Sequence, residues 1–105
     1  MPGTAAGTQR FGLMYAPNIT RGVNVLMLIA KLAAGYLPGY DIEITERHHR
    51  RKKDAPSGTA AKLAGQLQET RGEGHITHGR QGMSPRAEGE IGVHAVRAGD
   101  RKSVV

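Results

Sequence analysis

The amino-acid sequence predicts a single α+β domain, and three observations support this fold class. The chain has 105 residues, which is enough for one hydrophobic core and for one domain at most. Residues 20–37 and 57–71 repeat apolar side chains at the spacing of one helical face. Residues 41–48 and 90–97 instead alternate apolar and polar side chains, which is typical of half-buried strands.

The first predicted helix, residues 20–37, is apolar on two sides. The face expected to meet the core carries Val23, Leu26, Met27, Ala30 and Ala34. The second face carries Val25, Leu28, Ile29 and Leu32. Because one apolar face is enough to attach a helix to a core, we expect this helix to be covered on both sides, by the rest of its own domain or by another chain.

The strand predicted at residues 41–48 places two ionisable groups on its inward side. Ile42 and Ile44 face the core, and Glu46 and His48 share their parity. Ionisable side chains on the buried side of a strand need an explanation. One explanation is a functional cleft, and the other is a structural pair at the end of a sheet whose hydrogen bonds are satisfied.

The second predicted helix, residues 57–71, presents four apolar residues on one face and ends at Gly72. The periodicity weakens in residues 76–82 and predicts no element there. The last predicted strand, residues 90–97, places Ile91, Val93 and Ala95 on one face. The final five residues, 101–105, fit no periodicity, and we expect them to be a disordered tail.

Composition narrows the environment and the class of ligand. Fifteen Lys and Arg against nine Asp and Glu give a net charge of +6, which predicts attraction to nucleic acid, an acidic membrane surface or small multiply charged ligands. The absence of Cys excludes disulfides, thiolate zinc sites and a cysteine nucleophile, and favours a cytoplasmic location. No signal peptide is visible, nor an apolar stretch of the roughly 20 residues that would span a membrane.

Residues 46–60 carry the strongest chemical signal. Two histidines and a cluster of cations precede a Pro-Ser-Gly-Thr turn into a helix, where several backbone N–H groups lack intrahelical acceptors. This combination predicts an anion pocket with a proton donor beside it, and the alternative is an ordinary capped helix preceded by a basic loop.

Two rival ligands are less well supported. A metal site is not predicted, because no His-x3-His pair occurs, His48 and His49 project oppositely from a strand, and His75 and His78 lack an acidic partner at ligand spacing. A small basic RNA-binding or ribosome-associated protein remains the alternative function. It rests on the basic residues 47–53, but only three Tyr and one Phe are available for stacking.

Residues 46–60, Glu-Arg-His-His-Arg-Arg-Lys-Lys-Asp-Ala-Pro-Ser-Gly-Thr-Ala, closely resemble the signature of the 4-hydroxy-tetrahydrodipicolinate (dihydrodipicolinate) reductase family. Residues 16–24 and 90–100 resemble flanking segments of that family, so the resemblance extends from residue 16 to residue 100. It implies the family's C-terminal substrate-binding and oligomerisation domain, a mixed open β-sheet with helices packed on one face. The family's Rossmann domain is absent, because no Gly-x-x-Gly fingerprint follows a strand.

The resemblance implies a reductase that uses NADPH or NADH on a small cyclic dicarboxylate, in the diaminopimelate route to lysine. By position, His48 is the acid and Lys52 its cationic partner. The substrate carboxylate is implied to meet His49, Ser57, Gly58 and Thr59, and the nicotinamide end of the cofactor to meet Ala16, Pro17, Asn18 and Ile19.

The resemblance also implies a domain organisation. Residues 1–15 form a leader, 16–100 the domain, and 101–105 an unmatched tail. The chain is expected to be a fragment that is inactive alone, from a homotetrameric enzyme that binds neither nucleic acid nor membranes.

Overall fold

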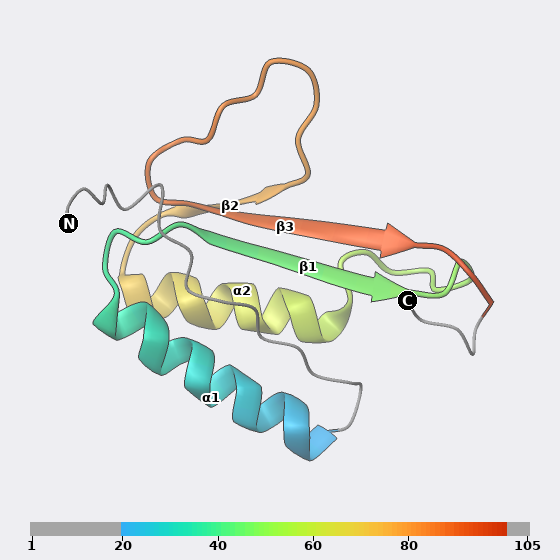
Figure 1. The fold of residues 1–105 in the computed structure, drawn as a ribbon, viewed down its shortest axis with the longest axis horizontal. Coiled ribbons are helices and arrows are strands. Elements are labelled where there is room, and N and C mark those ends of the chain that lie inside the picture. The colour runs from blue at the N-terminus through green and yellow to red at the C-terminus, as the bar shows by residue number, and fades with distance from the viewer. Residues whose placement is uncertain (1–19, 101–105) are drawn as a thin grey trace.

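The computed structural model describes residues 20–100, which form two helices and three strands (Figure 1). In chain order the elements are α1 (Thr20–Tyr36), β1 (Ile42–His48), α2 (Gly58–Arg71), β2 (His75–His78) and β3 (Glu90–Arg97). The expected leader and tail lie outside the described residues. Four of the five elements were predicted from periodicity, to within one residue at each end.

The three strands form one open sheet in the order β1-β3-β2. The register pairs Ile42 with Ile91 on one side of β3, and Ile76 with the same Ile91 on the other. Both pairings are parallel, so the expected α+β domain with an open sheet is confirmed, but its described strands are parallel rather than mixed. The reason is the loop of residues 79–89, which carries the chain back past β2 before β3 begins (Figure 1).

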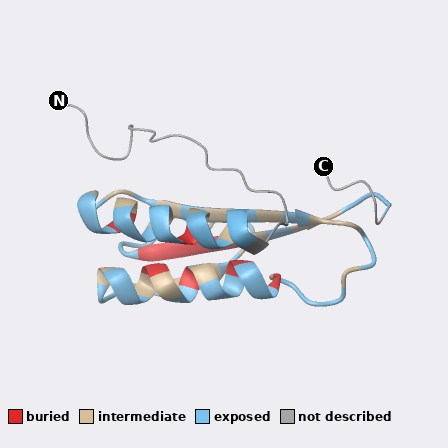
Figure 2. Ribbon diagram, turned by 90° about the horizontal axis from the view of Figure 1, so that it is seen from below, coloured by how far each residue is buried: buried red, intermediate tan, exposed pale blue. Residues whose placement is uncertain are grey.

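Both helices lie side by side on one face of the sheet, as expected, and the buried apolar residues lie between the layers (Figure 2). The core cluster contains Ala34 from α1, Leu67 from α2 and Ile91 from β3. Five partly buried residues pack against it: Ala30, Ile42, Ile44, Leu63 and Ile76. This core is small and wholly aliphatic, so polar contacts at the ends of the sheet have a large share in fixing the elements.

The second apolar face of α1 is exposed. Leu28 and Leu32 are each 61% exposed, and Val25 and Ile29 about half exposed, so no other described part of the domain covers them. Cover by the rest of the domain is therefore not found within residues 20–100, and cover by another chain stays a prediction. Within the same residues, no helix is long and apolar enough to cross a membrane.

Strand β2 was not predicted. Its four residues, His75–His78, have no clear alternation of apolar and polar side chains. It forms because β3 supplies hydrogen-bonding partners along its whole length, which is a tertiary effect. Gly74, with φ of +100°, leads into it, where the backbone passes close to Gly89.

Candidate functional site

Glu46 and His48 lie at the carboxyl end of β1, on the side of the sheet that the helices cover. Burial alternates along the strand with Ile42, Ile44, Glu46 and His48 on the more buried side, which confirms the predicted parity. The Nδ1 atom of His48 lies 2.7 Å from Oε1 of Glu46, and the two side chains are 24% and 9% exposed. The two ionisable groups that share the inward side of the strand therefore contact each other directly.

Glu46 also joins two other elements to this point. Both terminal nitrogens of Arg97, at the end of β3, donate to its two oxygens at 2.8 Å. The backbone N–H of Ser57, just before α2, donates to Oε2 at 2.8 Å. Burial opposes ionisation, but the hydrogen bonds from Arg97, His48 and Ser57 outweigh it and lower the pKa of Glu46 to about 2. Glu46 is therefore an ionised, nearly buried carboxylate that connects β1, β3 and the start of α2.

Arg97 was not among the predicted site residues. Its fork pairs with Glu46, and NH2 also donates to the backbone oxygen of Asp54 at 2.7 Å. The sequence did hold a signal for it, since Ile91, Val93 and Ala95 share a face and the next position on that face is Arg97. Its partners, 51 and 43 positions away, have no local pattern to mark them.

His49 has a hydrogen-bond pattern opposite to that of His48. Its Nδ1 accepts a hydrogen bond from the backbone N–H of Arg51 at 3.1 Å. A nitrogen that accepts carries no proton, so the neutral ring holds its proton on Nε2 and offers an N–H donor there. Such a donor suits a carboxylate oxygen. Nε2 of His49 is therefore the atom expected to make the predicted contact with the substrate.

Lys52 forms an ion pair with Asp54 within the loop that joins β1 to α2. Its Nζ lies 3.0 Å from Oδ1 of Asp54, and this hydrogen bond lowers the pKa of the Asp54 carboxyl. The Lys52 side chain is 24% exposed and the Asp54 side chain 60%, so this ion pair lies at the surface of the loop that leads into α2. A bound anion there would compete with Asp54 for the same cation.

The start of α2 supplies two free N–H donors. Ser57 is buried; its hydroxyl caps the helix by accepting from the backbone N–H of Ala60 at 3.2 Å, and its own N–H is bonded to Glu46. Gly58 and Thr59 are exposed, and their N–H groups have no acceptor in the described part of the chain. The N–H groups left free to meet an anion at this helix are therefore those of Gly58 and Thr59.

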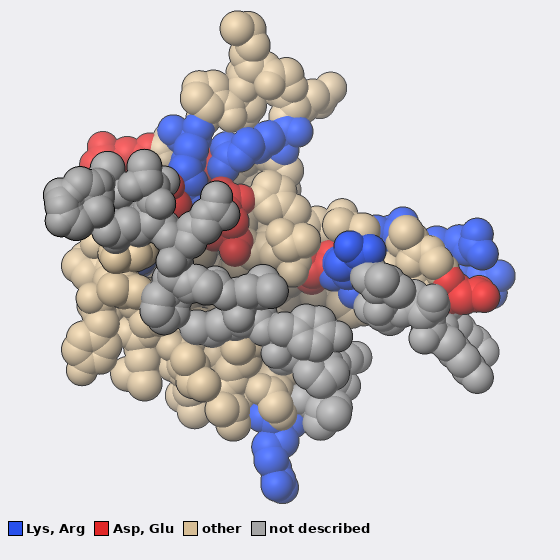
Figure 3. Space-filling view, in the orientation of Figure 1, with Lys and Arg blue, Asp and Glu red and all other residues tan. Residues whose placement is uncertain are grey.

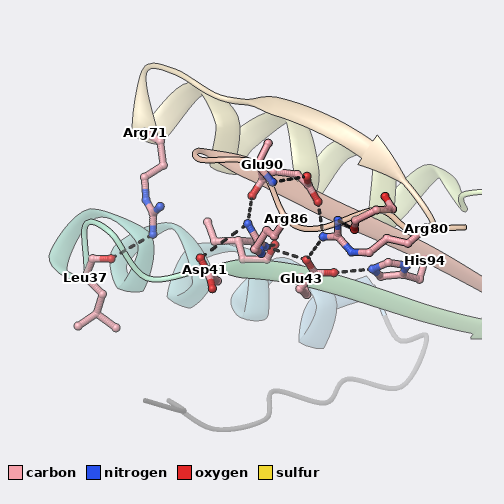
Figure 4. Close-up of polar contacts among 11 residues, drawn as sticks. Leu37, Asp41, Glu43, Arg71, Arg80, Arg86, Glu90 and His94 are labelled. Atoms are coloured by element: carbon pink, nitrogen blue, oxygen red, sulfur yellow. Dashed lines mark hydrogen bonds and ion pairs between the residues drawn. The ribbon is translucent and has the colours of Figure 1, made fainter. Parts of the chain in front are cut away.

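A second ionic cluster lies on the opposite, uncovered face of the sheet and was not predicted (Figure 4). Glu43 of β1 accepts from Arg80 and Arg86 at 2.8 Å each and contacts Nε2 of His94. Arg80 also pairs with Glu90. These contacts attach the loop of residues 79–89 to the sheet. On the face of the molecule drawn in Figure 3, acidic side chains lie among the basic groups.

The described surface also has an open depression beside β2 and β3. It is lined by Ala55, Pro56, His78, Gly79, Arg80, Val93, His94 and Ala95. Of the predicted site residues within 20–100, none lines it, although Ala55 and Pro56 precede Ser57 directly. Among residues 20–100, no group of three His, Asp or Glu is placed to hold a metal ion. The predicted cofactor contacts, Ala16 to Ile19, lie outside the described residues.

Comparison with known proteins gives one consistent result. A family model described as "Dihydrodipicolinate reductase, C-terminus" matches residues 22–104. Proteins named 4-hydroxy-tetrahydrodipicolinate reductase are similar in sequence: that of Methanosarcina mazei is 53% identical over 87 residues, covering 83% of this chain and 33% of its own length. The Rubrobacter xylanophilus protein is 50% identical, covering 83% and 35%, and the Aquifex aeolicus protein 51% identical, covering 84% and 34%. The chain spans about a third of the length of these relatives.

Proposed function

This chain belongs to the dihydrodipicolinate reductase family, through the family's C-terminal domain, and we propose that it forms the substrate-binding part of such a reductase. The proposed reaction is the NADPH- or NADH-dependent conversion of 4-hydroxy-tetrahydrodipicolinate to tetrahydrodipicolinate, in the diaminopimelate route to lysine. In it the ring loses its hydroxyl as water and gains a hydride and a proton. The relatives' names and the matched family model support the reaction class.

One observation supports the location of the site. His48 contacts Glu46, and Glu46 contacts the N–H of Ser57, so two hydrogen bonds connect the proton donor to the start of α2. Beside Ser57, Gly58 and Thr59 offer free N–H groups to an anion. A proton donor and a carboxylate-binding helix start are thereby held at a fixed separation, as a reaction on a cyclic dicarboxylate requires.

Each residue has a proposed role. His48 is the acid that protonates the ring after hydride addition, and Lys52 is the cation beside it, which exchanges its Asp54 partner for a carboxylate of the substrate. His49 Nε2–H and the N–H groups of Gly58 and Thr59 bind substrate carboxylate. Ser57 contributes through its position, because its hydroxyl and N–H are already bonded to the helix and to Glu46.

The cofactor supplies the hydride when it is bound. Ala16, Pro17, Asn18 and Ile19 are proposed to contact its nicotinamide end. The sequence contains no glycine fingerprint for a dinucleotide after a strand, so the 105-residue chain by itself is proposed to show no NADPH-dependent turnover. Measurable reduction at micromolar concentrations of this chain would contradict that part of the proposal.

We also propose that residues 16–100 form one substrate-binding and oligomerisation domain, with residues 1–15 as a leader and 101–105 as a tail, and that the full assembly is a homotetramer. The exposed apolar face of α1 supports association with another chain. The alternative of RNA binding has less support: of the basic residues 47–53, Arg47, Arg50, Arg51 and Lys53 are exposed, but this run holds no Tyr, Phe or Trp to stack on bases.

Calorimetric titration with pyridine-2,6-dicarboxylate, a planar mimic of the substrate, tests the proposal. Wild type should bind it, Lys52→Ala should bind at least roughly tenfold more weakly, and Lys53→Ala should bind as wild type. Lys53 is a matched control, because it is exposed and forms no ion pair among the described residues. Absence of binding to a chain that circular dichroism shows to be folded, or equal losses in both variants, would contradict the proposal.

A further inference from the structure

Glu46 lies too deep to meet a substrate, yet it makes more side-chain hydrogen bonds than any residue assigned a role above. We propose that Glu46, held by Arg97, is the positioning residue for His48: it fixes the neutral imidazole in the Nδ1–H tautomer and so makes Nε2 the atom that gives up the catalytic proton. This inference rests on the proposed function for its purpose, but its geometry stands independently of any ligand.

The tautomer follows from the chemistry of the carboxylate. An ionised carboxylate can only accept hydrogen bonds, so Nδ1 of His48, 2.7 Å from Oε1, must be the donor. When the ring carries two protons, the second sits on Nε2. Loss of that proton leaves a neutral ring whose remaining N–H is already bonded to Glu46. The ring therefore need not turn between its two states.

The Glu46 side chain is held in one orientation by its hydrogen bonds. Its Oε1 is shared by His48 and one nitrogen of Arg97, and its Oε2 by Ser57 N–H and the other nitrogen of Arg97. Each oxygen accepts two hydrogen bonds, and only 9% of the side chain is exposed. Rotation of the Glu46 carboxylate would therefore break several hydrogen bonds at once.

The surrounding charges favour an effect on orientation over an effect on net charge. Arg97 from β3 neutralises Glu46 directly, and Lys52 in the following loop is paired with Asp54. From α2, only the uncharged Ser57 N–H reaches Glu46. His48 thus contacts a carboxylate whose charge is balanced by Arg97. The main effect of this carboxylate on His48 is to select which ring nitrogen holds the proton.

The same chain contains a natural comparison on the other face of the sheet. His94 contacts Glu43 through Nε2, not through Nδ1. By the same reasoning its neutral ring holds the proton on Nε2. Two His–Glu pairs in one small domain therefore predict opposite tautomers, which a single spectrum can distinguish.

Replacement Glu46→Gln should reverse the tautomer of His48. The amide NH2 group replaces one Glu46 oxygen and meets an Arg97 nitrogen in either orientation, so the remaining neighbour decides: facing the Ser57 N–H would set a second pair of donors against each other. The backbone N–H cannot change, whereas an imidazole can move its proton to the other nitrogen. The NH2 group should therefore donate to Nδ1, and the ring proton should move to Nε2.

The test is a long-range ¹H–¹⁵N correlation spectrum of the histidine rings in the whole chain, at a pH where the rings are neutral. Wild type should show His48 with a protonated Nδ1 and His94 with a protonated Nε2. Glu46→Gln should exchange the two signal types of His48, and Glu43→Gln should leave His48 unchanged.

Two results would overturn the inference: an Nε2–H tautomer for His48 in wild type, or an unchanged Nδ1–H tautomer in folded Glu46→Gln. The wild-type result decides even if the variant fails to fold. Because no ligand is present, failure here is distinguishable from a failure to bind pyridine-2,6-dicarboxylate.

Discussion

The carboxylate of Glu46 accepts a hydrogen bond from the backbone N–H of Ser57 at 2.8 Å, across eleven positions of sequence. Through it, the strand that carries His48 is attached to the helix start that offers Gly58 and Thr59. Arg97 bonds both Glu46 oxygens from β3 and so completes the junction. The proposed acid and the proposed anion donors are thus held by one partly buried ion pair.

Replacing Arg97 should destabilise the domain. Arg97→Met leaves the Glu46 carboxylate with fewer partners and should cost about 2–4 kcal/mol in the free energy of unfolding, measured by urea denaturation. Arg97→Lys keeps the charge but loses the fork, so its cost should be intermediate. Arg50→Met is the control, because Arg50 and Asp100 are 65% and 77% exposed and 3.9 Å apart; its cost should stay within about 0.5 kcal/mol. Equal costs for Arg97→Met and Arg50→Met would contradict this account.

Glu46 should make the domain acid-sensitive. Its pKa is about 2 in the folded chain and is taken as 4.5 when unfolded, so its contribution to stability is complete above pH 4.5 and is lost as the pH falls towards 2. The expected contribution is about 2–3 kcal/mol. Thermal unfolding of wild type and Glu46→Gln across this range should show the gap between them closing as the pH falls. A gap that is constant down to pH 2 would mean that the Glu46 pKa is not lowered by folding.

The entry to β2 should tolerate no side chain at Gly74. A Cβ there would overlap the carbonyl oxygen of Gly89, and the φ of +100° is itself unfavourable for other residues. Gly79→Ala is the matched control, because its φ of +71° brings similar strain but its surroundings are open. Gly79→Ala should cost about 1–2 kcal/mol and Gly74→Ala clearly more, in denaturant unfolding. A Gly74→Ala variant as stable as Gly79→Ala would show that the close approach is absent in solution.

Arg71 should fix the angle between the two helices at their shared end. Its Nε donates to the Ala34 oxygen at 3.1 Å, and its NH2 donates to the Leu37 oxygen at 3.1 Å, the contact drawn in Figure 4; both satisfy carbonyls at the end of α1. Arg71→Met should lower the free energy of unfolding by about 1–2 kcal/mol and increase amide exchange in the last turn of α1. Lys62→Met on the exposed side of α2 should change neither quantity.

Much of this arrangement could be predicted from the sequence because it is periodic. The helices and the two longer strands follow from apolar spacing, and the inward parity of Glu46 and His48 follows from strand alternation. The sequence could not show that Glu46 takes the N–H of Ser57, since that contact depends on how the loop between them closes. Arg97 and β2 were missed for a related reason: both acquire their partners only when β3 enters the sheet.

The central claim is that the start of α2, beside the His48–Glu46 pair, is where the dicarboxylate binds. Backbone amide NMR of the chain during titration with pyridine-2,6-dicarboxylate tests it most directly. We expect saturable shifts of the Gly58 and Thr59 amides, with Gly79, which lines the separate depression, unchanged. Shifts confined to Gly79 and its neighbours, with Gly58 and Thr59 unmoved, would place the ligand elsewhere and contradict the account.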